Sequence, residues 1–450
     1  NDGALAEALS TRAIAASMWL DEPAIGRESA EQALALYRAL GDGEGIARTS
    51  LAYVSALGQK SGLPYAQAAL EESRRLGSRE YEGRFLNLLG IASRDHGDRR
   101  ANFGRAMAAF QAIDHRPHQA MVLNNLSLAE WRLGLYRRAY AHASQAVAIV
   151  SAGGALYNAT GYLDALGRAQ LGMGELDAAW QTFGQALANT REIGYHADEF
   201  VFHSGLGLVA LARGNAREAL DILVPAEPLL LARNVPEAAH VAAWIGAAHL
   251  ALGETALALE KTAQAVELLS RGVSVEYNAQ DVWWWRYQAL SAAPLPERER
   301  LTDEAWQALD RAREVMLGDI AGLSDPGLRR NYLNKVAVNR AIVQTWLREA
   351  GARGLPLAPL VERLAVDGDL QGQLERLLDI GVRLNGRAEA AGLPQDIMSE
   401  VEELCGAERV QLVLFDNQGQ PHEFAMGEAS PVAADVADLL AQARWLCALL

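Results

Sequence analysis

The sequence predicts a mainly α-helical protein, a solenoid of stacked helical hairpins. The first observation is a series of glycines 37, 40, 40 and 39 residues apart, namely Gly97, Gly134, Gly174, Gly214 and Gly253. The second is a small residue seven positions before each of them, namely Gly90, Ser127, Gly167, Gly207 and Gly246. The third is an alanine twelve positions after each, namely Ala109, Ala146, Ala186, Ala226 and Ala265. Positions aligned at one period indicate a repeated structural unit.

Each unit is predicted to be two helices joined at its glycine. In residues 121–150, apolar residues recur at spacings of three and four on both sides of Gly134, as amphipathic helices require. Glycine adopts the left-handed conformation that ends a helix at little cost. Small residues on both helices, such as Ser127 and Ala139, let the two backbones approach closely. A larger side chain there is expected to overpack by roughly 1–3 kcal/mol.

This order of residues resembles the tetratricopeptide repeat (TPR), which implies a right-handed superhelix with a concave groove. The resemblance rests on a leucine and a small residue in the first helix, glycine at the turn, and a small, bulky, small pattern such as Ala179, Phe183 and Ala186. The units depart from the family in being longer than about 34 residues, in having Asn102 where alanine is expected, and in mostly lacking a proline after the second helix. HEAT-type repeats of about 40–47 residues are the alternative, but the small-residue register favours TPR.

The array is predicted to comprise about eight units, or about 16 helices, over residues 1–322. Two weaker units come first, with turns at residues 21–23 and at Gly62, and an eighth begins near Val275 and ends in a long helix near residues 302–323. Units of this length resemble the TPR arrays of large bacterial signalling proteins of the STAND ATPase, cyclase-linked or kinase-linked type. The run of three tryptophans at residues 283–285 is interpreted as packing against the long final helix, with a docking patch as the alternative.

The segment after the array predicts a helical connector over residues 323–392. Residues 324–347 resemble a block that follows the array in those bacterial regulators, and its arginines Arg329, Arg330 and Arg340 either contact another domain or, as we favour, form the solvated face of a capping helix. Leucines at residues 370–384 share one helical face, which fits a dimerisation seam or simple packing equally well.

Residues 393–450 change in character and predict the N-terminal half of a small α/β domain. A helix over residues 394–405 leads to predicted strands at 409–415 and 421–426, which form an antiparallel hairpin around the turn at Asn417. This order after a leucine-rich connector resembles the opening of a GAF domain, a sensory fold. The rest of that fold is missing, so the resemblance assigns no ligand-binding residue.

The composition favours a cytoplasmic protein without a nucleic-acid ligand. The 450 residues carry a net charge of −15, whereas phosphate binding requires a basic footprint. No apolar run is long enough to span a membrane, and the N-terminus shows no signal sequence. Two cysteines, Cys405 and Cys447, do not make a disulfide scaffold. Because the chain starts without methionine inside an amphipathic stretch, we interpret it as part of a larger protein.

The sequence predicts no catalytic residue, no cofactor and no metal site. It contains no Walker loop, HExxH or paired CxxC motif. The pairs His115 with His118 and His196 with His203 are interpreted as ordinary loop or helix residues, because no further ligand stands at a suitable spacing. Cys405 is interpreted as a buried thiol.

The predicted partner-binding residues lie on the first helices of the repeats. Ten positions before the turn glycines stand Asn87, Asn124, Asp164 and Ser204, at a position that faces the groove in the TPR family. The same resemblance places five more residues on or near that face, namely Arg84, Arg94, Trp131, Arg132 and Arg168. Asparagine both donates to and accepts from a peptide backbone, and arginine holds carboxylates. The alternative is that a helix face opposite the core is polar in any case.

These observations predict a non-catalytic protein–protein interaction and regulatory module of a bacterial signal-transduction protein. The groove would bind a peptide or a partner domain, which can belong to the same polypeptide, and the connector helix would permit a homodimer. Replacing Asn87 and Asn124 by alanine is then expected to weaken binding with little change in stability. The alternative is a packing scaffold of a multidomain nucleotide cyclase, kinase or ATPase whose catalytic domain lies outside this chain.

Overall fold

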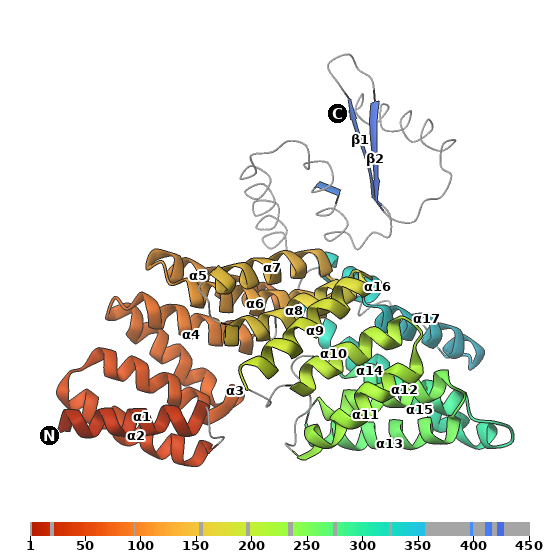
Figure 1. Ribbon diagram of the computed structural model, residues 1–450, viewed down its shortest axis with the longest axis horizontal. Coiled ribbons are helices and arrows are strands. Elements are labelled where there is room, and N and C mark those ends of the chain that lie inside the picture. Colours follow the sequence, from red (N-terminus) through yellow and green to blue (C-terminus); the bar gives the residue numbers. More distant parts are fainter. Residues whose placement is uncertain are drawn as a thin grey trace. The chain divides into compact units, whose positions relative to one another are not determined.

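The structure is a computed structural model that describes residues 2–18, 22–93, 95–152, 156–194, 199–232, 237–272, 277–323, 326–355, 397–398, 410–415 and 421–426. The chain divides into two compact units, Asn1–Gly372 and Gln373–Leu450. The described part of the first unit is a helical solenoid (Figure 1). Its helices are α1 (Asp2–Met18), α2 (Pro23–Leu40), α3 (Gly43–Arg75), α4 (Arg79–Ala92), α5 (His96–Ala112), α6 (Arg116–Arg132), α7 (Tyr136–Ala152), α8 (Leu156–Gly172), α9 (Leu176–Glu192), α10 (Glu199–Ala212), α11 (Ala216–Ala232), α12 (Ala238–Ala251), α13 (Thr255–Arg271), α14 (Gln280–Ser291), α15 (Glu297–Ile320), α16 (Pro326–Lys335) and α17 (Ala337–Ala352).

Successive helices pack as hairpins, in the pairs α4 with α5, α6 with α7, α8 with α9, α10 with α11, and α12 with α13. The run α3 contains two helices, because Gly58 interrupts it with a φ of 72° and a ψ of 170°. Counting both, the described residues up to Ile320 form the 16 helices that the repeat predicts, and no described strand precedes residue 410. The prediction of a mainly helical, TPR-like solenoid is therefore confirmed.

The turns of the fourth to seventh units lie at the predicted glycines. Gly134, Gly174, Gly214 and Gly253 have φ values of 78°, 79°, 79° and 76°, a left-handed conformation that glycine adopts without a steric penalty. Two predicted turn positions are wrong. Gly97 lies in the first turn of α5, where the Asp95 carboxylate accepts its N–H at 2.8 Å and caps the helix. In the second unit the turn is at Gly58, four residues before the predicted Gly62.

The small residues of the first helices lie at close helix contacts, as predicted. A Cβ added at Gly90 would lie 2.6 Å from the Phe103 ring, and one at Gly207 would lie 2.4 Å from Leu223. Ser127 is fully buried and donates a hydrogen bond to the Ala139 carbonyl at 2.7 Å across its hairpin. In each of these hairpins, a large side chain or a backbone carbonyl of the second helix thus packs against the small residue of the first helix.

The last helices form a separate core with the middle of the array. Leu309, Met316 and Ile320 of α15 pack with Tyr332 of α16 and Trp346 of α17, and Leu133 and Leu135 from the α6–α7 turn join the same cluster. Trp283 and Trp284 are partly buried against it, which confirms the packing interpretation of the tryptophan run. The capping helix predicted within residues 324–347 is two helices, α16 and α17, separated at Val336.

In the second unit the structure describes a two-stranded antiparallel hairpin of β1 (Val410–Phe415) and β2 (Pro421–Met426), with Val410 opposite Met426. The predicted hairpin is confirmed to within one residue at its start. The leucine-rich stretch at 370–384, Cys405, and most of the helix predicted at 394–405 lie outside the described residues.

A candidate partner-binding cavity

Three of the four polar residues predicted to line the groove are buried. Asn87, Asp164 and Ser204 are 5%, 7% and 3% exposed, and only Asn124 is half-buried. Ser204 donates its hydroxyl to the Phe200 carbonyl of its own helix at 2.8 Å. The expectation that this row of side chains is exposed is therefore wrong for Asn87, Asp164 and Ser204, because neighbouring side chains pack over them.

Asp164 and Arg168 form a buried ion pair at the centre of this packing. The Arg168 Nε donates to Asp164 Oδ2 at 2.7 Å, and Arg168 is 1% exposed. Its guanidinium carbon lies 4.3 Å from the centroid of the Tyr277 ring and 5.6 Å from that of Trp131. Tyr277 precedes α14, so a later segment of the chain covers the predicted groove positions of α6 and α8.

Trp244 and His240 complete this cluster. The Tyr277 ring lies 5.0 Å from Trp244 and 5.2 Å from His240, measured between ring centroids. Trp244 donates its indole N–H to Asp281 at 2.9 Å. Burial raises the pKa of Asp281 to about 6, against the opposing effect of its indole hydrogen bonds. These contacts fix the start of α14 against α12 and against the middle of the array.

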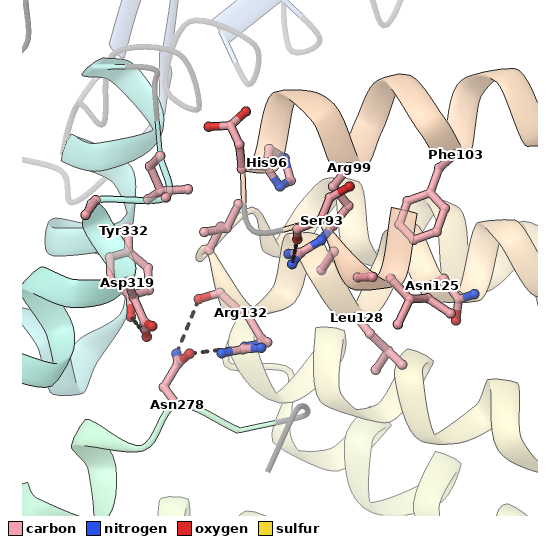
Figure 2. Close-up of a pocket in the computed structure, with 18 of the residues that line it drawn as sticks. Ser93, His96, Arg99, Phe103, Asn125, Leu128, Arg132, Asn278, Asp319 and Tyr332 are labelled. Atoms are coloured by element: carbon pink, nitrogen blue, oxygen red, sulfur yellow. Dashed lines mark hydrogen bonds between the residues drawn. The ribbon is translucent and has the colours of Figure 1, made fainter. Parts of the chain in front are cut away.

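Arg132 also contacts this segment. Its Nε donates to the Asn278 Oδ1 at 3.2 Å, while the Asn278 amide donates to the Arg132 carbonyl at 3.4 Å (Figure 2).

The other two predicted arginines lie away from this segment or outside the described residues. Arg84 is half-buried, forms an ion pair with Glu80 at 3.4 Å, and lies over the Tyr81 ring. Arg94 lies outside the described residues.

Arg132 lines a cavity of about 890 Å³ inside the first unit. One wall comes from the α4–α5 turn, the start of α5 and the end of α6, and the other from the end of α15 and from α16, with the Asn278 segment between them (Figure 2). Apolar side chains of Phe103, Leu128 and Leu323 and polar groups of Asn125 and Asn278 line it together. Asn125 donates its amide to Asn87 Oδ1 at 2.9 Å, so the predicted residue Asn87 supports this wall from behind.

The charged groups of the cavity come from both walls. Arg99 and Arg132 are half-buried, and Asp95 and Asp319 face the same space. Burial lowers the pKa of Arg99, the nearby Arg132 charge lowers it further, and Asp95 opposes both. His96 is 2% exposed, and burial together with the charge of Arg100 lowers its pKa to about 3, so its imidazole is neutral at pH 7.

Of the predicted partner contacts that the structure describes, Arg132 lines this cavity, whereas the lining residues Arg99, His96, Asn125, Asn278 and Asp319 are not predicted from the sequence. Arg99 and His96 lie at the start of α5, and Asn125 follows the predicted Asn124. Asn278 and Asp319 come about 150–190 residues after Arg132 in the sequence. The repeat register carries no signal for any of them. Among the described residues there is no group of three or more histidine, cysteine or acidic side chains that suits a metal ion. None of the described helices combines the length and apolarity that a membrane crossing needs.

No protein-family model matches the chain, and no curated protein matches it. Solved structures of three helical proteins are similar to it. A Rap protein complexed with competence and sporulation factor has 14% identity and a TM-score of 0.46, covering 76% of this chain and 97% of its own. Aspartyl phosphate phosphatase F from Bacillus subtilis has 13% identity and a TM-score of 0.47, covering 81% and 96%. Yeast Tom70 has 11% identity and a TM-score of 0.34, covering 90% and 96%. Because these scores lie below 0.5, the fold assignment rests on the helical hairpins of the chain itself.

Proposed function

We propose that this chain is a non-catalytic partner-binding module that takes an extended peptide or protein segment into the cavity between α4–α6 and α15–α16. The observation that carries the proposal is the lining of this cavity, in which side-chain amides and guanidinium groups stand beside apolar side chains. Its volume of about 890 Å³ lies in the range of ligand sites, roughly 300–1,000 Å³.

The two amide side chains suit a peptide backbone. Asn125 and Asn278 each carry a donor and an acceptor, so each can bond a peptide N–H and a carbonyl. Asn87 orients Asn125, and Arg132 orients Asn278 through the hydrogen bonds described above. A fixed pair of amides costs less conformational entropy on binding than two mobile ones. The apolar side chains of Phe103 and Leu128 then provide the burial that anchors a peptide side chain.

Among the predicted contacts, we propose Arg132 as a direct contact and Asn87 as the residue that holds Asn125 in the cavity wall. Trp131, Asp164 and Arg168 are proposed to act through the packing of Tyr277, whose neighbour in the sequence, Asn278, lines the cavity. For Arg84, Asn124 and Ser204, which do not line the cavity, we propose no direct contact with the partner.

Gly318 provides the experiment for this proposal. It lines the cavity from α15, and a Cβ added there meets no atom within 4 Å. Gly318→Leu therefore adds an apolar side chain to the cavity lining without a clash at the Cβ, and loss of a helical glycine is expected to stabilise the helix by about 0.5–1 kcal/mol. The matched control is Gly184→Leu in α9, which also has open space at its Cβ but lies outside the cavity lining.

The measurement is affinity capture on the immobilised chain, with the captured proteins identified by mass spectrometry. We expect the wild type and Gly184→Leu to retain the same partner and Gly318→Leu to lose it. Thermal unfolding of all three proteins shows that the loss is not due to misfolding. Equal capture by Gly318→Leu and the wild type would contradict the proposal.

The wider context is a second part of the proposal. We infer that the chain belongs to a bacterial signalling protein, with an array at residues 1–322, a connector at 323–392 and a domain from 393 whose hairpin β1–β2 opens a GAF-like sheet. The antiparallel pairing of Val410–Phe415 with Pro421–Met426 supports this. The packing scaffold of a larger cyclase, kinase or ATPase remains the competing function, and it predicts that Gly318→Leu changes no capture.

A further inference from the structure

The side of α11 that faces away from the core exposes a cluster of apolar side chains. Val224, Pro225, Pro228 and Leu229 are all exposed, and Leu229 is 55% accessible. Their spacings of three and four residues place them on one side of the helix. The opposite side, which carries Leu223, is buried in the core of the array. A contiguous apolar patch on the surface of a folded protein marks an interaction site.

The two prolines open the hydrogen-bond ladder of α11 within the same stretch. Proline has no N–H, so Pro225 donates no helical hydrogen bond to the carbonyl of Asp221, four residues earlier. For the same reason Pro228 donates none to the carbonyl of Val224. Both acceptor residues have exposed side chains. The apolar cluster is therefore accompanied by two backbone acceptors that a donor from outside the helix can bond.

The apolar cluster continues onto α13, which lies beside α11 (Figure 1). Lys261 of α13 donates to Glu227 of α11 at 2.6 Å, and Arg217 of α11 donates to Glu254, the residue before α13, at 3.2 Å. Leu257 lies between these two contacts on α13 and is 45% exposed. The α11–α13 surface is the set of exposed apolar residues Val224, Pro225, Pro228, Leu229 and Leu257.

The charge around the α11–α13 surface is negative. The basic side chains of the two helices are all paired with acids, namely Arg217 with Glu254, Lys261 with Glu227 and Arg271 with Glu267. Asp221 and Glu260 are exposed, and neither forms an ion pair with another residue that the structure describes. The unpaired charges next to the apolar cluster are thus carboxylates, which favour a cationic partner.

We propose that the α11–α13 surface binds a basic amphipathic helix of another protein. The apolar side chains of that helix pack on Val224, Leu229 and Leu257. Its lysine or arginine side chains donate to the Asp221 carboxylate and to the two carbonyls that the prolines leave open. A second copy of the chain is a poorer occupant, because the same surface would set carboxylates and carbonyls against like groups. The surface shares no residue with the cavity lining, so this proposal goes beyond the proposed function and does not depend on it.

The experiment is fluorescence polarisation of the full chain with a labelled synthetic helix of leucine and lysine that has its leucines on one face. One control peptide has the same composition with leucine and lysine alternating, a pattern that makes no amphipathic helix. A second control peptide has glutamate in place of lysine. We expect the leucine–lysine helix to bind at least about tenfold more tightly than either control peptide.

Leu229→Lys tests the surface itself, because it removes an apolar contact and adds a charge that repels the peptide. Leu5→Lys in α1 is the matched control, since Leu5 is 53% exposed, as Leu229 nearly is. We expect Leu229→Lys to weaken binding of the leucine–lysine helix by at least about tenfold and Leu5→Lys to leave it unchanged. Equal losses in the two variants, or equal binding of the helix and its alternating isomer by the wild type, would overturn the proposal.

Pro225→Ala separates binding from folding. Alanine restores the N–H that bonds the Asp221 carbonyl, so the variant is expected to unfold at a higher temperature and yet to bind the peptide more weakly. Unchanged binding would show that the open carbonyl plays no part. Gly318→Leu is expected to bind the peptide as the wild type does, and a loss there would move the peptide to the cavity. A dimer in sedimentation that Leu229→Lys dissociates would assign the surface to a second copy. Each of these three results would contradict the proposal.

Discussion

The guanidinium of Arg168 in α8 stacks on the ring of Tyr277, with its central carbon 4.3 Å from the ring centroid. These residues are more than a hundred positions apart in the sequence, and both are buried. The contact joins the fifth repeat to the start of α14, and it neighbours the Arg132–Asn278 pair that borders the cavity. A residue that the repeat register assigns to a partner surface is thus part of the internal packing that shapes the site.

Arg168→Met is expected to destabilise the protein strongly. It removes the cation from a pair in which the side chains of Arg168 and Asp164 are 2% and 10% exposed. Loss of one partner from a buried ion pair typically costs about 3–5 kcal/mol, because the other charge stays buried. Urea unfolding followed by circular dichroism measures the effect as a lower midpoint.

Arg271→Met is the control for this prediction. Its ion pair with Glu267 on α13 is exposed, with 57% and 67% of the two side chains accessible. Exposed substitutions usually change stability by less than about 0.5 kcal/mol. Equal midpoint shifts for the two variants would show that the Arg168 pair contributes no more than a surface pair.

Asn87→Ala is expected to reduce stability, in contrast to the nearly neutral effect that its sequence position suggests. Asn87 is 5% exposed and accepts the Asn125 amide at 2.9 Å. Its loss leaves a half-buried donor unpaired, which costs about 1–3 kcal/mol. Thermal unfolding measures this, with the exposed Gln32→Ala in α2 as control. An Asn87→Ala protein as stable as the control would show that the hydrogen bond between Asn125 and Asn87 adds no net stability.

Gly207→Ala is expected to destabilise the sixth unit, although alanine favours helices. The added Cβ would lie 2.4 Å from Leu223, closer than carbon atoms pack. Overpacking of this kind costs about 1–3 kcal/mol. Gly184→Ala is the matched control, because its Cβ meets no atom within 4 Å and the substitution is expected to stabilise α9 slightly. Similar thermal midpoints for the two variants would contradict the close contact.

The hairpin β1–β2 is expected to exchange its amide hydrogens faster than the central repeats do. In the truncated GAF-like interpretation the two strands lack the rest of their sheet, and such hairpins have unpaired edges and are marginally stable. Hydrogen exchange with mass spectrometry compares Val410–Phe415 with a buried helix such as α12. Equal protection of the two segments would show that the second unit is a complete, stable domain and would contradict the truncated GAF-like interpretation.

The helical repeat could be predicted from the sequence because its signals are local. Gly207 and Leu223 lie sixteen residues apart and contact each other within one hairpin, so a fixed period reports the contact. The third unit shows the limit of this signal, since its turn contains Asp95 as a helix cap, and the next glycine, Gly97, falls inside α5. An N-cap carboxylate such as Asp95 begins the second helix of a unit, whereas a turn glycine follows the end of the first, and glycine spacing alone does not distinguish the two.

The candidate site could not be predicted because the curvature of the array assembles it. Asn331 of α16 donates its amide to the Leu133 carbonyl at the α6–α7 turn, and Asn278 meets Arg132 beside it. These pairs are about 150–200 residues apart, and no repeat period encodes which units meet across the solenoid. The TPR resemblance places Asp164 and Ser204 on the groove face, but both residues are buried in the structure.

The pair of Glu130 and His142 is expected to make stability depend on pH. His142 Nδ1 lies 2.8 Å from Glu130 Oε2, and the Glu130 side chain is buried. Burial alone would raise the pKa of Glu130, but His142, Arg100 and Arg138 outweigh burial and lower it to about 2. Burial alone would lower the pKa of His142, but Glu130 outweighs it and raises the pKa above 6.5.

The signs of these shifts define a pH window. The raised histidine pKa gives stability that is fully present below pH 6.5 and is lost as the pH rises through the folded value. The lowered glutamate pKa gives stability that is present above pH 4.5 and is lost as the pH falls toward 2. The pair therefore contributes most between pH 4.5 and 6.5.

His142→Gln tests this window. The difference in unfolding free energy between the wild type and the variant is expected to be about 1.5–3 kcal/mol near the middle of the window, the range for hydrogen bonds to charged groups. It is expected to shrink as the pH rises above the folded histidine pKa. Urea midpoints measured from pH 4 to pH 9 give the profile, and His203→Gln, whose ring contacts the Glu199 carbonyl rather than a carboxylate, is the control. A difference that stays constant across this range, or one that grows with pH, would show that the pair is not charged in the folded protein.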